Sequence, residues 1–140
     1  PLVERSAFNF ILIRYAEVLL TYAEAQNEAS GPDQSVYDAI NQLRRRPDIN
    51  MPEVPKGLTK DQMREVIRRE RRIELTFEGL YYSDILRWKT AEKENNGMMH
   101  NYDGIEVVKR SFNPKRDYLW PIPYNQTVLN PNLEQNPNWD

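Results

Sequence analysis

The Gly31-Pro32 dipeptide separates two segments whose apolar residues recur at helical spacing, and a Gly-Pro pair stops a helix. We predict one helix over residues 14–29 and a second over 34–45, which Asp33 caps and Pro47 closes. Because only a few residues join these helices, they should pack antiparallel as a helical hairpin. This hairpin is the best-defined element of the predicted fold.

The residues that follow the hairpin predict further helix. Proline and glycine recur over 47–58, which indicates an extended connector. Thr59 and Gln62 then match a capping box, in which each side chain hydrogen-bonds the other's backbone N–H. We expect this helix to end at Gly79, with a short helix over 81–90. The predicted apolar face of the longer helix, between Thr59 and Gly79, consists of Met63, Val66, Ile67, Ile73 and Phe77.

Little strand is predicted. An extended lead-in or short strand is expected at 8–13, a turn at 95–97 and a short strand at 105–108. The tail from Asn113 is rich in proline and asparagine, and Pro121 and Pro123 exclude a helix around them. Tyr118-Leu119-Trp120 and Ile122 are too apolar for water, so this tail should wrap back over the helices. The prediction is one mainly α domain over 1–140, with an irregular Pro/Asn-rich tail.

Bulk properties exclude several functions. The chain has 140 residues, a formal net charge of −2 and no cysteine, which rules out disulfides, thiol catalysis and cysteine metal sites within it. No apolar run approaches the roughly 20 residues of a membrane helix, and no signal peptide is present. The chain starts at Pro1 without methionine and enters patterned sequence almost at once. We therefore expect it to be the C-terminal portion of a longer protein.

Candidates for catalysis are few. His100 is the single histidine, and no nucleophile elbow, phosphate loop or metal-binding motif accompanies it. Glu70 and Glu74 stand four apart on a predicted helix, where paired carboxylates could act as acid and base. The alternative is a structural role in ion pairs, with Arg14 and Arg44 as partners. We favour the ion pairs, and we expect no enzyme activity, no metal and no cofactor.

A basic cluster on the same helix suggests nucleic-acid binding at first sight. However, Glu65, Glu70 and Glu74 are interleaved with the arginines, and no aromatic residues that could stack on bases lie among them. A solvated, salt-bridged helix face is the better interpretation, so we expect no nucleic acid as partner. The cluster consists of Arg64, Arg68, Arg69, Arg71 and Arg72.

Tyr15, Val18 and Tyr22 stand at the spacing of the first helix of a tetratricopeptide repeat, and Pro47 follows the second predicted helix. Four further segments, in this order, resemble the C-terminal region of the SusD/RagB family. They are Arg14–Leu20 with Tyr22–Ala25, Ile40–Arg46, Glu70–Leu75 through Glu78-Gly79 with Asp84 and Arg87-Trp88, and Leu119–Pro123 followed by Asn130-Pro131 and Gln135–Pro137. Two positions depart from the family pattern: Tyr81 stands where arginine is common, and Ile85 where leucine is usual.

The resemblance implies a tetratricopeptide-like fold and a surface lipoprotein of the outer membrane. Proteins of this family bind oligosaccharides or other nutrients and hand them to a TonB-dependent, SusC-like outer-membrane barrel without chemistry. The membrane would be reached only through an N-terminal lipid anchor on an upstream segment. An intracellular tetratricopeptide-type adaptor between proteins is the alternative.

The resemblance assigns no ligand-binding residue. Sugar sites combine aromatic platforms with polar side chains, because the face of a pyranose ring is apolar and its edge carries hydroxyls. Tyr82, Tyr102 and Phe112 are candidate platforms, although packing is the commoner role of large aromatic residues. Trp88, Trp120 and Trp139 are interpreted as structural, the last two as anchors of the tail.

Overall fold

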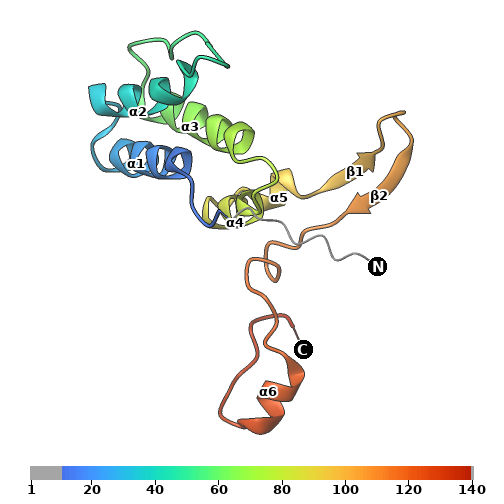
Figure 1. The fold of residues 1–140 in the computed structure, drawn as a ribbon. Coiled ribbons are helices and arrows are strands. Elements are labelled where there is room, and N and C mark those ends of the chain that lie inside the picture. The colour runs from blue at the N-terminus through green and yellow to red at the C-terminus, as the bar shows by residue number, and fades with distance from the viewer. Residues whose placement is uncertain (1–10, 140) are drawn as a thin grey trace, which may run out of the picture. The chain divides into compact units, whose positions relative to one another are not determined.

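The computed structural model describes residues 11–139 and is mainly helical, as the sequence predicts. It divides into two compact units, one that ends at Glu78 and one that begins at Gly79, and each is described by itself (Figure 1). The described part of the first unit contains α1 (Tyr15–Ser30), α2 (Gln34–Arg44) and α3 (Lys60–Glu74). The second contains α4 (Leu80–Arg87), α5 (Ala91–Glu94), β1 (Gly97–His100), β2 (Glu106–Arg110) and α6 (Tyr124–Leu129). Residues 11–13 form no helix or strand, and residues 8–10 of the predicted lead-in lie outside the described residues.

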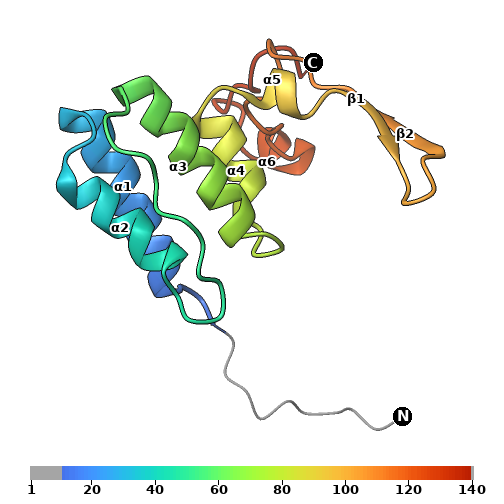
Figure 2. The same cartoon turned by 90° about the horizontal axis from the view of Figure 1, so that it is seen from above.

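The predicted helical hairpin is present in the first unit. Helices α1 and α2 lie side by side and α3 packs against α1 (Figure 2). Asp33 caps α2 as expected, and its carboxylate accepts hydrogen bonds from the N–H groups of Ser35 and Val36. Leu20 and Ile40 are fully buried in this core. Each such side chain stabilises the unit by about 1.5–3 kcal/mol through the hydrophobic effect.

The connector between α2 and α3 is extended, as predicted, and core side chains hold its backbone. The Val54 N–H donates to Oδ1 of Asn41 at 2.9 Å. The Leu58 N–H donates to the Tyr37 hydroxyl oxygen at 3.1 Å. Asn41 is buried. Its side-chain oxygen therefore gives the Val54 N–H a hydrogen-bond partner in a place that water does not reach.

Helix α3 starts with the predicted capping box but ends earlier than expected. Both hydrogen bonds between Thr59 and Gln62 are present, whereas the helix stops at Glu74 rather than Gly79. Phe77 adopts a φ of 66° beyond the helix end and is fully exposed, so the prediction that it belongs to the apolar face is wrong. Ile73 is exposed as well. The buried stripe instead follows a spacing of four residues: Met63, Ile67, Arg71 and Leu75.

The second unit is organised around a small apolar cluster of Ile85, Ala91 and Phe112. Phe112 is fixed by the side-chain amide of Asn96, whose Oδ1 accepts the Phe112 N–H at 2.6 Å. The Tyr118 ring meets the Phe112 ring edge to face, with centroids 4.9 Å apart. Ring pairs of this geometry add about 0.5–1.5 kcal/mol beyond the area they bury.

The strand predicted at 105–108 is observed as β2, but its partner β1 was not predicted. The strands pair antiparallel with a register irregularity between Met99 and His100, and every residue of both strands is exposed. β1 escaped prediction because Gly97–His100 is short and follows two turn-forming asparagines. Figure 1 shows this hairpin as an arm that follows α5.

The tail packs in part against the rest of the second unit, because Tyr118 lies on the cluster of Ile85, Ala91 and Phe112, and it also hydrogen-bonds to itself. Oε1 and Nε2 of Gln135 hydrogen-bond the N–H and carbonyl of Ile122 at 2.7 and 2.9 Å. Trp120 remains 68% exposed and Leu119 is exposed too, so the expectation that the apolar tail residues leave water is wrong for these two, whereas Tyr118 and Ile122 are half-buried. The tail also contains α6 (Tyr124–Leu129), so the expectation that Pro121 and Pro123 exclude a helix around them is wrong on the C-terminal side of Pro123. α6 begins directly after Pro123, at an N-terminal position where the missing N–H costs nothing.

Candidate functional site

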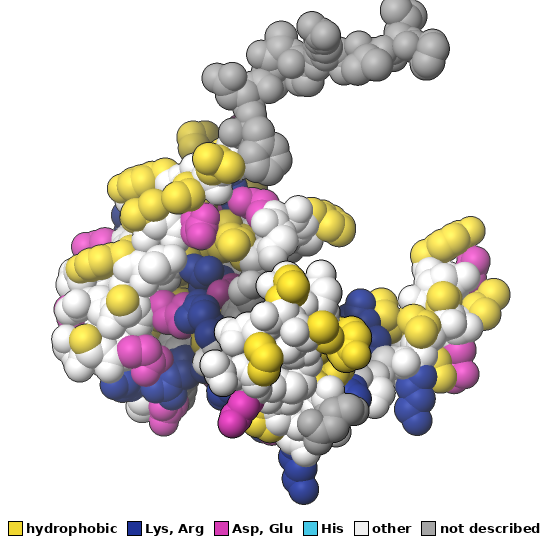
Figure 3. Space-filling view, turned by 90° about the horizontal axis from the view of Figure 1, so that it is seen from below, with side chains coloured by type: hydrophobic (Ala, Val, Ile, Leu, Met, Phe, Trp, Pro, Cys, Tyr) yellow, Lys and Arg dark blue, Asp and Glu magenta, His cyan; other side chains and the backbone are white. Residues whose placement is uncertain are grey.

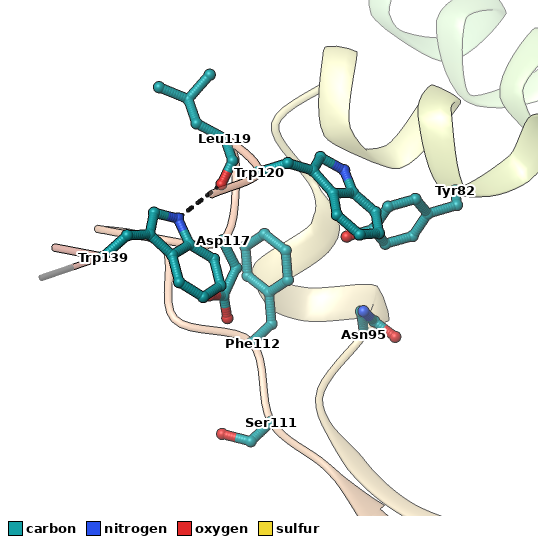
Figure 4. Close-up of a pocket in the computed structure, with 8 residues that line it drawn as sticks. All are labelled: Tyr82, Asn95, Ser111, Phe112, Asp117, Leu119, Trp120 and Trp139. Atoms are coloured by element: carbon teal, nitrogen blue, oxygen red, sulfur yellow. Dashed lines mark hydrogen bonds between the residues drawn. The ribbon is translucent and has the colours of Figure 1, made fainter. Parts of the chain in front are cut away.

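Aromatic side chains from separate segments of the second unit line a pocket of about 170 Å³. Its aromatic members are Tyr82 on α4, Phe112 after β2, and Trp120 and Trp139 in the tail. Its polar members are Asn95, Ser111 and Asp117. In Figure 4 the Phe112 ring lies between the Trp139 indole and the Tyr82–Trp120 pair. The pocket thus offers apolar ring faces beside a few hydrogen-bonding groups, the usual composition of a small-molecule site.

Local contacts hold the two indoles of the pocket. The Trp139 Nε1–H donates to the Leu119 carbonyl at 2.9 Å (Figure 4), and the Arg116 guanidinium lies over the Trp139 ring at 4.4 Å. The Trp120 ring meets Tyr82 edge to face at 6.1 Å. Because Trp120 is largely exposed, its indole face is open to a ligand. The structure therefore presents a positioned aromatic platform.

Asp117 supplies a negative charge at the same pocket. Arg116 Nε donates to Oδ1 of Asp117 at 2.6 Å, and the Asn113 N–H donates to its Oδ2 at 2.7 Å. These hydrogen bonds lower the pKa of the Asp117 carboxyl, which is therefore ionised at neutral pH. An ionised carboxylate is an acceptor only, so it suits a hydroxyl group of a ligand.

The three aromatic candidates from the sequence fall in different places. Tyr82 and Phe112 both line the pocket, although Phe112 is mostly buried and serves the apolar cluster as well. Tyr102 lies in the turn of the β1–β2 hairpin, is almost fully exposed, and does not line this pocket. Trp120 and Trp139 line it although they were interpreted as structural. The spacing of these tryptophans in the tail gave no sign that they approach Tyr82.

The four charged residues proposed for ion pairs meet as two pairs in the first unit. Arg14 Nη1 donates to Oε1 of Glu74 at 2.9 Å. Arg44 Nη1 lies 3.5 Å from Oε1 of Glu70. Arg46, which the sequence reasoning overlooked, donates to both oxygens of Glu74 at 2.9 and 2.6 Å. Both carboxylates are thus engaged by guanidinium groups, as the ion-pair interpretation expects.

Arg14 also binds a second carboxylate group, that of Glu78. Nη2 of Arg14 donates to Oε1 of Glu78 at 2.6 Å and to the Glu74 carbonyl at 2.8 Å. These bonds, first with Glu78 and then with Glu74, raise the pKa of Arg14. The same guanidinium lowers the pKa of the Glu78 carboxyl. The cluster ties the residue before α1 to the end of α3.

Most of the arginines of α3 have partners within the protein. Arg64 binds Glu28 of α1 at 2.5 Å, and Arg68 lies 3.6 Å from Glu65. The prediction of a solvated face is wrong for Arg71, which is only 5% exposed and donates to the Thr21 hydroxyl at 3.0 Å. On the face that Figure 3 draws, acidic and basic side chains lie side by side.

His100 lies on the exposed strand β1. In residues 11–139, no group of three histidine, cysteine, aspartate or glutamate side chains converges as metal ligands. Within the same residues, no helix combines the length and apolar content required to cross a membrane.

Comparison with known proteins identifies the family to which this chain belongs. The model of the SusD family matches residues 3–139. The chain belongs to the SusD family. It is 37% identical over 136 residues to SusD-like protein P2 of Formosa agariphila. The aligned residues make up 94% of this chain and 26% of that protein. These matches do not favour the intracellular tetratricopeptide adaptor.

Solved structures of SusD-like proteins share the fold. A SusD-like carbohydrate-binding protein from Bacteroides fragilis superposes with a TM-score of 0.78 at 37% identity, over 88% of this chain and 28% of that one. A SusD homologue from Bacteroides thetaiotaomicron gives a TM-score of 0.72 at 35% identity, over 91% and 26%. The chain therefore spans about a quarter of the length of the SusD relatives it matches.

Proposed function

We propose that this chain is part of a non-enzymatic nutrient-binding lipoprotein at the cell surface. As the C-terminal, single-domain portion of a longer protein, it would help to bind an oligosaccharide and deliver it to a TonB-dependent, SusC-like outer-membrane barrel. Membership of the SusD family carries this proposal. The carbohydrate-binding description of the Bacteroides fragilis relative supports a glycan as ligand.

The aromatic pocket supports ligand binding by this portion of the protein. Its volume of about 170 Å³ lies below the roughly 300 Å³ at which pockets for drug-sized ligands begin. It therefore suits one sugar ring stacked on the Trp120 indole, with Asn95, Ser111 and Asp117 as partners of the ring hydroxyls. Outer-membrane attachment would come from a lipid anchor upstream of these residues.

Affinity purification of the tagged full-length protein from its own membranes tests the delivery role. We expect a TonB-dependent barrel at near-equal amount, identified by mass spectrometry, and binding of glycans to the same preparation. Recovery of soluble cytoplasmic proteins, with nothing in the membrane fraction, would overturn the proposal. An untagged strain treated in parallel shows which proteins bind the resin by themselves.

A further inference from the structure

A second hollow of about 440 Å³ adjoins the aromatic pocket in the same unit. The two share Tyr82, Asn95 and Ser111 as lining residues, so these side chains form the boundary between them. The second hollow also contains Tyr81 and Arg110. Together the two hollows offer a surface longer than one sugar ring.

Arg110 places a positive charge in the second hollow, outside the set of residues that line the aromatic pocket. It is the last residue of β2 and is exposed. Its contact is a long one of 3.4 Å from Nη1 to Oδ1 of Asn95, and among residues 11–139 no carboxylate forms an ion pair with it. Tyr81, which also lines this hollow, donates a hydrogen bond from its hydroxyl to the carboxylate of Glu94. The guanidinium fork of Arg110 therefore remains available to an anion.

The opposite end differs in charge and character. The ionised Asp117 carboxylate in the aromatic pocket is paired with Arg116, so that end combines apolar rings with hydrogen-bond acceptors. A neutral ring suits the Trp120 platform, while a carboxylate or sulfate suits a planar guanidinium, which donates two parallel hydrogen bonds to it. An elongated ligand with these two ends would satisfy both hollows.

We propose that the two hollows bind an acidic saccharide of at least two rings, with one ring on Trp120 and an anionic group on Arg110. This proposal rests on the proposed function and names the class of glycan that this portion of the protein recognises. The anionic group is a uronate carboxylate or a sulfate ester, which share the geometry that Arg110 reads. Tyr82, Asn95 and Ser111 contact the linkage between the rings.

Calorimetry on the full-length protein at low salt tests the proposal with matched probes. Oligogalacturonate is compared with its methyl ester, and sulfated dextran oligosaccharide with neutral dextran oligosaccharide. Preference for one charged probe identifies carboxylate or sulfate as the source of the anion. We expect at least one charged probe to bind about tenfold more tightly than its neutral counterpart, because a charge-assisted hydrogen bond is lost in the latter.

Two matched variants locate the effect. Arg110→Gln should abolish the preference for the charged probe, and Lys109→Gln should preserve it, because neighbouring side chains on β2 point to opposite faces. Trp120→Ala should weaken charged and neutral probes alike. Equal binding of charged and neutral probes, or unchanged binding by Arg110→Gln, would overturn the proposal. If the barrel still co-purifies and neutral glycans still bind, only the acidic ligand is rejected; if neither is seen, the proposed function falls as well.

Discussion

Arg14 and Glu74 connect the start of α1 to the end of α3 through a side-chain bond of 2.9 Å and a bond from Nη2 of Arg14 to the Glu74 carbonyl of 2.8 Å. The carbonyl is one of the last in α3, where the helix supplies no backbone partner. Glu74 is mostly buried and would be costly without a cation beside it. The side chain of Arg14, the residue before α1, thus supplies a hydrogen-bond donor to the C-terminal end of α3.

Replacing Arg14 with methionine should destabilise the first unit by about 1–3 kcal/mol, because hydrogen bonds to charged groups contribute roughly that much. The fall in free energy of unfolding is measured by urea denaturation. Arg45→Met is the control, since the Arg45–Glu53 pair is more than half exposed and such pairs contribute about 0–1 kcal/mol. Equal losses in the two variants would contradict the role given to Arg14.

Glu70→Ala should lower the melting temperature clearly, because it leaves the mostly buried guanidinium of Arg44 without its acid partner. We expect a loss of about 1–3 kcal/mol, the cost of an unsatisfied buried group. Glu65→Ala removes an exposed carboxylate from the same helix and should change stability little. A melting temperature of Glu70→Ala that equals the parent's would show that the pair does not stabilise the unit.

Asn41→Ala should cost about 1–3 kcal/mol, because it leaves the buried N–H of Val54 without an acceptor. Asn41→Asp retains an acceptor oxygen and separates loss of the hydrogen bond from loss of the side chain. Hydrogen exchange at the Val54 amide reports the contact directly. Slow exchange at that amide in Asn41→Ala would show that something other than Asn41 protects it.

Stability should decrease as the pH falls below about 4.5. Arg64 lowers the pKa of Glu28 and Arg14 lowers that of Glu78, both from an ordinary value of 4.5. Each pair therefore contributes stability above the unfolded-state pKa, and the contribution disappears as the pH falls through the lower folded-state pKa. Urea denaturation between pH 7 and pH 3 measures the loss. In Arg14→Met the Glu78 part should be absent, so a pH dependence equal to the parent's would exclude that contribution.

Much of the first unit could be predicted because its signals are local. The Asp33 cap and the Thr59 box depend on residues within three positions of one another, and the structure contains both. The end of α3 could not be predicted this way. Ile73 and Phe77 match a helical stripe, but Ile73 lies on the exposed side of α3, and the helix ends at Glu74, before Phe77 with its left-handed backbone.

Only some of the residues that line the candidate pocket could be predicted from the sequence. Tyr82 was chosen as an aromatic platform, whereas Trp120 and Trp139 were assigned to tail packing. Hydrogen bonds within the tail bring the two tryptophans to the pocket. One of them runs from Asn136 Nδ2 to the Trp120 carbonyl at 2.6 Å. Pairings of this kind have no periodic signature, so sequence patterns do not reveal them.

The anchored connector and the exposed β1–β2 hairpin should differ in how they tolerate evolutionary change in length. Insertions between α2 and α3 would pull Val54 and Leu58 from their side-chain acceptors. The hairpin's apolar side chains are exposed on its strands (Figure 3), and its turn at Tyr102 holds no part of either core. Extra residues there would disturb only the arm. We therefore expect homologues to differ in the length of the β1–β2 hairpin, while the connector between α2 and α3 keeps its length.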